Sequence, residues 1–261
     1  MEDRKAILVV SSGTSNIKAR KESIEALEER IAREFTDFEV RRAFTSMKII
    51  DRIRTSEGTV IDSPSEALKR LCGEGFNEVI LQPMQIIPGM EYEKLIGELE
   101  QYRDCFRKAG IGKPLLYSEE DYPAVVAALK GHLPELSGGQ AAVLMGHGSS
   151  HSAQRLYLDL QEYIDKAAVR AYIGTIKGTP GISDIIDRLR RSGIREAVLM
   201  PFMLVAGNHA LMDMASDEEY SWKTLLTRAG FKVDIYLKGL GENTQYQEIY
   251  LNRIRETMEN S

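Results

Sequence analysis

The second half of the chain repeats two segments of the first half. Residues 7–15 (ILVVSSGTS) align with residues 142–150 (AVLMGHGSS), and residues 75–84 (GFNEVILQPM) align with residues 193–202 (GIREAVLMPF). In the first pair an apolar run leads into a turn of small residues and then into a helical pattern. A chance match between two common α/β patterns is the alternative, and we favour a duplication that produces two similar lobes.

Short apolar runs alternate with helical patterns along the chain, which is typical of parallel sheets covered on both faces. The predicted strands are Ala6–Val10, Glu39–Phe44, Glu78–Gln82, Pro114–Tyr117, Ala141–Met145, Arg170–Ile173, Ala197–Met200 and Val233–Tyr236. The first helix is expected after a Ser15 cap, and the later ones over Ser65–Cys72, Glu91–Lys108, Ala124–His132, Ala153–Lys166, Ile182–Arg191, Glu219–Arg228 and Tyr246–Met258.

These patterns predict an α/β fold with two similar lobes, each a four-stranded parallel sheet flanked by helices. Pro134 and the Ser-Gly-Gly turn at 137–139 indicate the connection between them. We therefore expect an N-terminal lobe over residues 1–135 and a C-terminal lobe over residues 136–261. A pseudo-twofold axis would relate the lobes, with an active-site cleft between them.

Composition excludes several classes of protein. The formal net charge is -5, so nothing global favours nucleic acid or an anionic membrane as partner. No apolar run is long enough to span a bilayer, and the first residues do not resemble a secretory signal. Cys72 and Cys105 show no metal-type spacing, and we expect reduced thiols in the cytoplasm.

Two of the four histidines follow predicted strands, at the edge where parallel sheets bind ligands. The repeat aligns His147 with Ser12, and His209 with Glu91. His147 could instead fix its turn by bonding a nearby carbonyl, and His209 could bond Asp213 within a helix. The second bond is compatible with metal binding, because a carboxylate orients an imidazole ligand.

The two remaining histidines are weaker candidates. His151 is expected at the rim of the site, and His132 in a structural role at the end of a helix. The turns at 13–15 and 148–150 are expected to cap helices and could also hold anions. The chain contains neither a GxxxxGK[ST] phosphate loop nor a GxGxxG turn after a strand, so we expect no nucleotide.

Several motifs together resemble one known family, the anaerobic cobalt chelatases of the CbiK type. These are sirohydrochlorin cobaltochelatases of the class II chelatase fold, which ferrochelatases share. The resemblance extends in order along essentially the whole chain. Its motifs are LVVSSGTS (8–15), RAFTS (42–46), GMEYEK (89–94), MGHG (145–148), MPFMLVAGNHA (200–210), DMASD (213–217), WK (222–223) and GLGEN (239–243).

The resemblance implies roles for individual residues. His147 and His209 would face the metal and accept protons, and Glu91 would act as a further catalytic acid–base group. The family commonly has glutamate in a GTVEG segment where this chain reads GTIKG, so Lys177 replaces an acid. The metal ligands would then be two histidines with water or Glu91, or Lys177 would hold a substrate carboxylate. The replacement is also compatible with a different metal, a different macrocycle or lost activity.

The activity implied is ATP-independent insertion of Co²⁺ into sirohydrochlorin, or into its oxidised or precorrin-2 form, in anaerobic cobalamin biosynthesis. Fe²⁺, Ni²⁺ and Zn²⁺ also suit imidazole ligands. Iron insertion and a non-catalytic tetrapyrrole or metal carrier are the alternatives. The arginines and lysine at 41, 42, 48, 52 and 54 are more simply a solvated surface than a carboxylate site, and homo-oligomerisation stays open. The residues expected to contact the macrocycle are Ser11, Ser12, Gly13, Thr14, Met90, Met203, Leu204 and Lys177.

Overall fold

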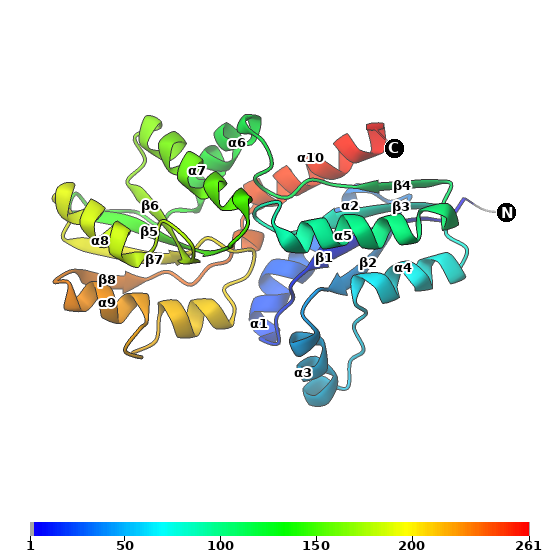
Figure 1. The fold of residues 1–261 in the computed structure, drawn as a ribbon, viewed down its shortest axis with the longest axis horizontal. Helices are drawn as coiled ribbons and strands as arrows, with labels where there is room; N and C mark the ends of the chain where they lie inside the picture. The colour runs from blue at the N-terminus through cyan, green and yellow to red at the C-terminus, as the bar shows by residue number, and fades with distance from the viewer. Residues whose placement is uncertain (1–2, 261) are drawn as a thin grey trace. The chain divides into compact units, whose positions relative to one another are not determined.

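The first repeat forms a four-stranded parallel sheet in the computed structural model, which describes residues 3–260. The strand order is β2-β1-β3-β4 (Figure 1). Each strand except the last extends one of the predicted apolar runs or matches it. The strands are β1 (Lys5–Ser11), β2 (Glu39–Phe44), β3 (Glu78–Pro83) and β4 (Lys108–Ile111).

Helices cover this sheet because their apolar faces repeat with helical spacing. One sheet face packs against the buried leucines of α4 and α5, including Leu68 and Leu95. The first helix is capped by Asn16, whose side chain accepts from the Ala19 amide, so the predicted Ser15 cap is wrong. The helices are α1 (Ile17–Ala19), continued by a π-helical turn η1 (Arg20–Glu25) into α2 (Ala26–Glu34), then α3 (Met47–Glu57), α4 (Pro64–Gly73), α5 (Met90–Gln101), η2 (Arg103–Cys105) and α10 (Thr244–Asn260).

The second repeat forms a sheet of the same topology, with order β6-β5-β7-β8. The predicted fold class is confirmed: both sheets are parallel, four-stranded and flanked by helices. The elements are η3 (Glu119–Asp121), α6 (Tyr122–His132), β5 (Gln140–Gly148), η4 (Ser152–Gln154), α7 (Arg155–Lys166), β6 (Ala171–Lys177), α8 (Ile182–Arg191), β7 (Glu196–Pro201), η5 (Ala210–Met214), α9 (Trp222–Arg228), β8 (Lys232–Ile235) and η6 (Leu240–Glu242).

Two further predictions in the first half are wrong, and one helix was not predicted. The fourth strand is β4, which pairs with β3 from Glu78 opposite Lys108, rather than Pro114–Tyr117. Helix α5 ends at Gln101 instead of Lys108, and α3 was missed although Ser46 caps it. Leu115 and Leu116 are buried, and burial gives them the apolar pattern of a strand. Their amides instead donate to carbonyls of the segment that follows β3.

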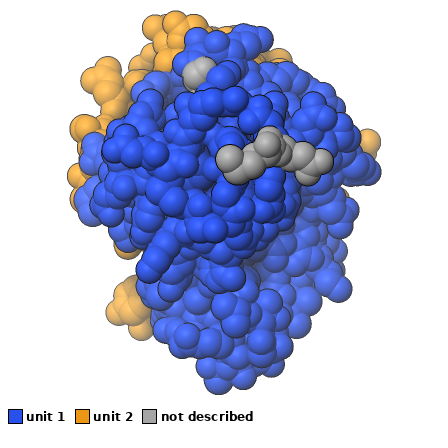
Figure 2. Space-filling view, turned by 90° about the vertical axis from the view of Figure 1, so that its right-hand side faces the viewer, with its two compact units in different colours: residues 1–117, 246–261 blue, residues 118–245 orange. Residues whose placement is uncertain are grey.

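The chain folds into two compact units, residues 1–117 with 246–261 and residues 118–245 (Figure 2). This partition differs from the predicted division at residue 135 by the placement of α6 and α10. Tyr122 of α6 stacks on Tyr163 of α7, with ring centroids 4.7 Å apart, so α6 packs with the second unit. The hydroxyl of Tyr250 in α10 donates to the Met84 carbonyl at 3.2 Å, within the first unit.

Cys72 and Cys105 form a disulfide, with their Cα atoms 5.6 Å apart. The expectation of two reduced thiols is therefore wrong for this structure. The bridge joins the last turn of α4 to η2, two segments that the sheet brings together although 33 positions separate them in the chain. None of the helices formed by residues 3–260 combines the length and apolar character needed to cross a bilayer.

Candidate metal-handling site

His147 lies near the carboxyl end of β5, between two glycines that close packing requires. A side-chain carbon at Gly146 would lie 2.8 Å from the Tyr157 ring, and one at Gly148 would overlap the carbonyl oxygen of Lys177. Gly148 also has a positive φ of 73°, which side chains other than glycine rarely adopt. The strand can therefore end in this tight turn only with glycines beside the histidine.

The His147 ring is held by its own turn. Its Nδ1 donates to the Gly148 carbonyl oxygen at 3.0 Å. This is the bond expected if His147 fixes its own turn. Behind the turn, the buried Tyr157 hydrogen-bonds the Gly148 backbone and packs edge-to-face on Phe202, with centroids 6.5 Å apart. Burial raises the pKa of Tyr157, while the hydrogen bond to the Gly148 backbone partly opposes that effect.

His209 reaches the same edge from the segment after β7. It directly precedes η5, and its Nδ1 donates to Oδ2 of Asp213 at 2.5 Å. About half of its side chain is exposed, 49%, so the imidazole is available to small solutes. The predicted bond between His209 and Asp213 is present.

The structure brings the two histidines together. Their ring centroids are 5.0 Å apart and the ring planes are inclined by 69°. Because both Nδ1 atoms donate to oxygens, each neutral ring carries its lone pair on Nε2, the nitrogen that can ligate a cation. Within residues 3–260 no group of three or more His, Cys, Asp and Glu side chains could hold a metal ion.

Lys177 is the last residue of β6 and pairs with Gly148 across the sheet. Residues in register on parallel strands lie on the same face of the sheet. Lys177 is therefore on the same face as Gly148, whereas His147, one residue earlier, is on the opposite face. The lysine is exposed at the carboxyl edge. Its register therefore places Lys177 beside the turn that follows His147, on the sheet face opposite to that of His147.

The first unit holds the other catalytic candidate and most of the expected macrocycle contacts, at the carboxyl edge of its own sheet. Ser11 is buried, whereas Met90, the first residue of α5, is 63% exposed and Glu91 beside it is also exposed. Gly13 has a positive φ of 80°, and a side-chain carbon there would strike the Phe44 ring. Ser12 is exposed and Thr14 is buried within the same turn.

Two predicted macrocycle contacts of the second unit pack against its interior. Leu204 is only 8% exposed, and Met203 is partly buried against the apolar core of the second unit. Leu204 therefore offers little surface to a ligand. Its role, like the roles of the first-unit residues, stays a prediction.

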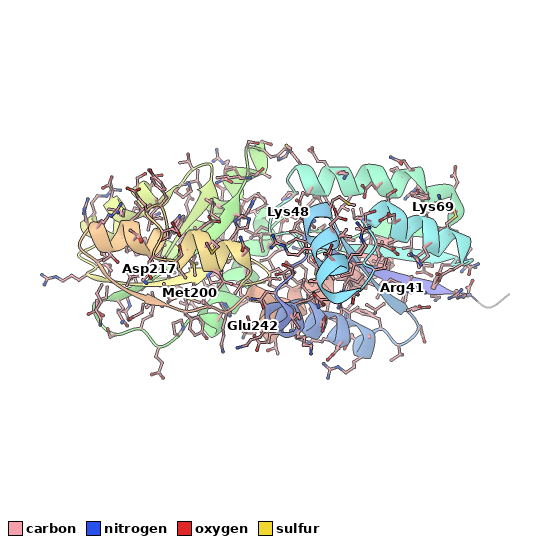
Figure 3. All side chains as sticks on the ribbon, turned by 90° about the horizontal axis from the view of Figure 1, so that it is seen from below. Arg41, Lys48, Lys69, Met200, Asp217 and Glu242 are labelled. Carbon is pink, nitrogen blue, oxygen red and sulfur yellow. A yellow bond between two sulfur atoms is a disulfide. The ribbon has the colours of Figure 1, made fainter. Side chains whose placement is uncertain are left out.

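The basic residues between positions 41 and 54 are dispersed and partly neutralised. Arg41 lies on β2 and Lys48 on α3 (Figure 3). Arg41 pairs with Glu39 and Glu74, and Arg42 with Glu25 and Glu28. Arg54 pairs with Asp51. These bonds favour the interpretation as a solvated, internally balanced surface.

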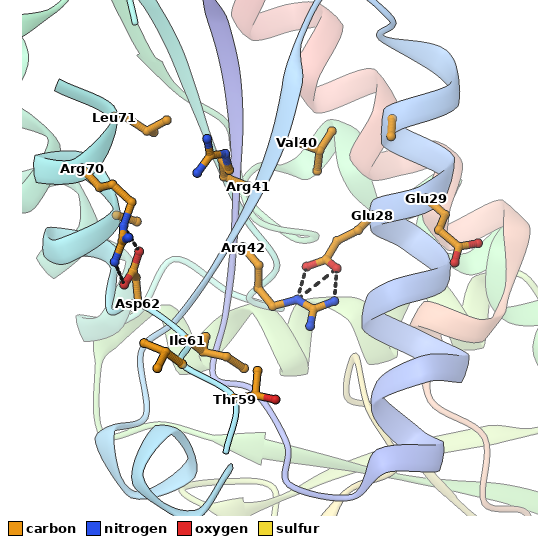
Figure 4. Close-up of a pocket in the computed structure, with 13 residues that line it drawn as sticks. Glu28, Glu29, Val40, Arg41, Arg42, Thr59, Ile61, Asp62, Arg70 and Leu71 are labelled. Atoms are coloured by element: carbon orange, nitrogen blue, oxygen red, sulfur yellow. Dashed lines mark hydrogen bonds and ion pairs between the residues drawn. The ribbon is translucent and has the colours of Figure 1, made fainter. Parts of the chain in front are cut away.

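A cavity of about 570 Å³ lies in the first unit between α2, β2 and α4. Arg42 and Arg70, two of the arginines lining it, are bonded to Glu28 and Asp62 respectively (Figure 4). A second cavity, of about 470 Å³, borders β4 and the end of α10. Neither cavity contains either histidine.

Comparison with solved structures defines the class of fold. SirB from Bacillus subtilis, solved with Fe³⁺, matches with a TM-score of 0.65 and 17% identity, covering 98% of this chain and 96% of that one. DR2241 from Deinococcus radiodurans, a multi-domain protein with structural similarity to chelatases, matches with a TM-score of 0.61 and 14% identity, covering 97% of this chain and 55% of that one. Together the two matches identify a chelatase-type α/β fold.

Sequence comparison gives the family: the chain belongs to the cobalt chelatase (CbiK) family, whose model matches residues 5–259. The sirohydrochlorin cobaltochelatase of Salmonella typhimurium is 38% identical over 255 residues, covering 98% of this chain and 97% of that protein. The sirohydrochlorin cobaltochelatase CbiKC of Nitratidesulfovibrio vulgaris is 32% identical over 254 residues, covering 96% and 89%. The predicted family is confirmed.

Proposed function

We propose that this chain is a sirohydrochlorin cobaltochelatase, an enzyme that inserts Co²⁺ into sirohydrochlorin in cobalamin biosynthesis. Its family membership and its two relatives of that name support the activity. The observation that carries the chemistry is the pair of imidazoles 5.0 Å apart, each with Nδ1 engaged as a donor.

In this proposal His147 and His209 present Co²⁺ to the macrocycle through their Nε2 atoms. Neutral imidazole suits first-row divalent ions, and two such ligands hold an ion less firmly than a closed cage of four. Insertion forms bonds from Co²⁺ to the ring nitrogens and releases two N–H protons. Once the ion has left them, the same imidazoles can accept those protons through Nε2.

The other site residues have proposed roles with weaker support. Glu91 would accept a proton, and Met90 with the turn of residues 11–14 would contact the macrocycle. Lys177, exposed at the edge of its sheet, would hold a macrocycle carboxylate as a point charge. Met203 would contact the ring through its partly exposed surface.

We also propose that the enzyme acts in the cytoplasm without a nucleotide, a membrane or nucleic acid as partner. The disulfide between Cys72 and Cys105 is unusual for a reducing compartment. Alkylation of free thiols in freshly lysed cells would therefore test the location, since two reduced thiols fit cytoplasm and an intact bridge argues against it.

The test of function is to mix the protein with excess sirohydrochlorin and Co²⁺ or Fe²⁺, and to follow macrocycle absorption. Multiple turnovers with Co²⁺ support the proposal. Faster turnover with Fe²⁺ would make the protein an iron chelatase, and stoichiometric binding without turnover would make it a carrier.

Substitution tests the site. His147→Ala and His209→Ala are each expected to lower the insertion rate about 100-fold or more, because each removes a ligand and a base. His151→Asn is the matched control, because asparagine can replace the cap that His151 provides for the Ala153 amide. Normal circular dichroism with unchanged rates in both alanine variants would contradict the assignment.

A further inference from the structure

The side chain of Gln154 connects the two loops at the carboxyl edge of the second sheet. Its Oε1 accepts from the Ser149 amide at 2.8 Å, in the loop that follows His147. Its Nε2 donates to Thr175 Oγ1 and to the Thr179 carbonyl, each at 2.9 Å. Both N–H groups and the oxygen of this carboxamide therefore have partners.

The backbone around Gln154 leaves little room for adjustment. A side-chain carbon at Gly178 would lie 2.9 Å from Gln154 Cδ and 3.0 Å from the Ser149 carbonyl oxygen. Gly148 packs still more closely: a side-chain carbon there would lie 1.8 Å from the Lys177 carbonyl oxygen and 2.7 Å from Thr175 Cβ. The segments that follow His147 and Lys177 thus contact each other through their backbones. The hydrogen bonds of the Gln154 carboxamide fix the position of one segment relative to the other.

We infer that Gln154 is a positioning residue of the metal-handling site, an inference that rests on the proposed function. It holds the turn of His147 against the loop of Lys177, and so keeps the imidazole at its separation from His209. Misplacement of a ligand by a fraction of an ångström weakens metal binding, and outer hydrogen-bond partners of metal sites commonly change affinity about 10- to 100-fold.

Helix α7, which begins directly after Gln154, offers a matched control. Gln161 lies seven residues later on α7, is buried, and also ties its carboxamide to β6. Its Oε1 accepts from the Ile173 amide at 2.7 Å, and its Nε2 donates to the Ala171 carbonyl at 3.1 Å. Gln161 therefore performs the same kind of bonding in the body of the sheet, away from the histidines.

The experiment compares Gln154→Met with Gln161→Met in the full-length protein. Both changes remove a carboxamide and keep a long side chain, so both are expected to lower the melting temperature. The inference predicts that only Gln154→Met raises the Kd for Co²⁺, measured by calorimetry without macrocycle, by about tenfold or more. It also predicts that kcat/KM for Co²⁺ falls to the same extent, while Gln161→Met stays within about twofold of wild type.

Equal Co²⁺ affinities for the two variants would overturn the inference, whereas a wild-type protein that never metallates sirohydrochlorin would overturn the proposed function instead. If Gln154→Met does not fold, Thr175→Val removes one of its acceptors with little change of shape. A Co²⁺ affinity within twofold of wild type in that variant would count against the positioning role.

Discussion

Replacing Asp213 by asparagine tests how the structure prepares His209 for a cation. Asp213 Oδ2 accepts from His209 Nδ1 at 2.5 Å. An asparagine oxygen can accept the same proton, so Asp213→Asn keeps the ring tautomer and removes only the negative charge. The change therefore isolates the electrostatic part of the interaction.

The expected effect follows from the geometry. Adding the 2.5 Å bond, the width of the ring and a metal–nitrogen bond of about 2.1 Å puts the carboxylate roughly 7 Å from an ion on Nε2. The side chains of His209 and Asp213 are 49% and 44% exposed, so solvent screens the attraction. With an effective dielectric constant between about 40 and 80, a dication gains about 1 to 2.5 kcal/mol. Asp213→Asn should therefore weaken Co²⁺ binding about 5- to 60-fold.

The assay is a Co²⁺ titration at pH 7.5 followed by initial rates of macrocycle metallation. Asp217→Asn is the control, because Asp217 lies four residues further on, is 92% exposed and pairs with Lys223 instead of a histidine. We expect that variant to bind Co²⁺ like wild type. If Asp213→Asn also binds Co²⁺ within twofold of wild type, the carboxylate does not support the imidazole and the reasoning fails.

Two further predictions concern stability. The Cys72–Cys105 bridge spans 33 positions, so chain entropy predicts that reduction, or alanine at both positions, lowers the unfolding free energy by roughly 3–4 kcal/mol; chemical denaturation with and without reductant measures this, and an unchanged midpoint would refute it. Burial lowers the pKa of His132 in the folded protein. Below the pKa of the unfolded state, the unfolded chain therefore binds a proton at His132 more readily than the folded chain does. The buried neutral His132 makes its full contribution to the free energy of unfolding above about pH 6.5, the pKa of histidine in the unfolded chain. That contribution is lost as the pH falls through the lower pKa of His132 in the folded protein. Thermal melts between pH 8 and 5 should therefore show a steeper acid loss for wild type than for His132→Phe, and parallel curves would contradict this.

Much of the fold could be predicted because burial leaves a local record in the sequence. The central strands β1, β3, β5 and β7 are covered on both faces, and their near-continuous apolar runs identify them. The edge strand β4 has no such record. Its sequence, Lys-Ala-Gly-Ile, is partly exposed, and only pairing with β3 makes it a strand.

The site could be predicted in part for the same reason. His147 ends one buried strand of the second half and His209 follows another, so the sequence predicts both at one sheet edge. Gln154 was not predicted, although one signal was present: it is the N-cap residue of α7 and lies seven positions before Gln161, so helical spacing puts both amides on the side of the buried Tyr157 and Ile164. The sequence does not say which distant backbone groups such an amide will bond.

The amino-acid sequence by itself determined the strand–helix alternation, the similarity of the two halves and the family motifs around the two histidines. These properties depend on the spacing of apolar residues and glycines over a few turns of chain. Only the tertiary structure decided the 5.0 Å approach of the imidazoles, the exchange of α6 and α10 between units, and the pairing of Cys72 with Cys105. Each of these joins segments that are far apart in the chain. No local pattern of residues encodes such partners, so the packing of the whole fold selects them.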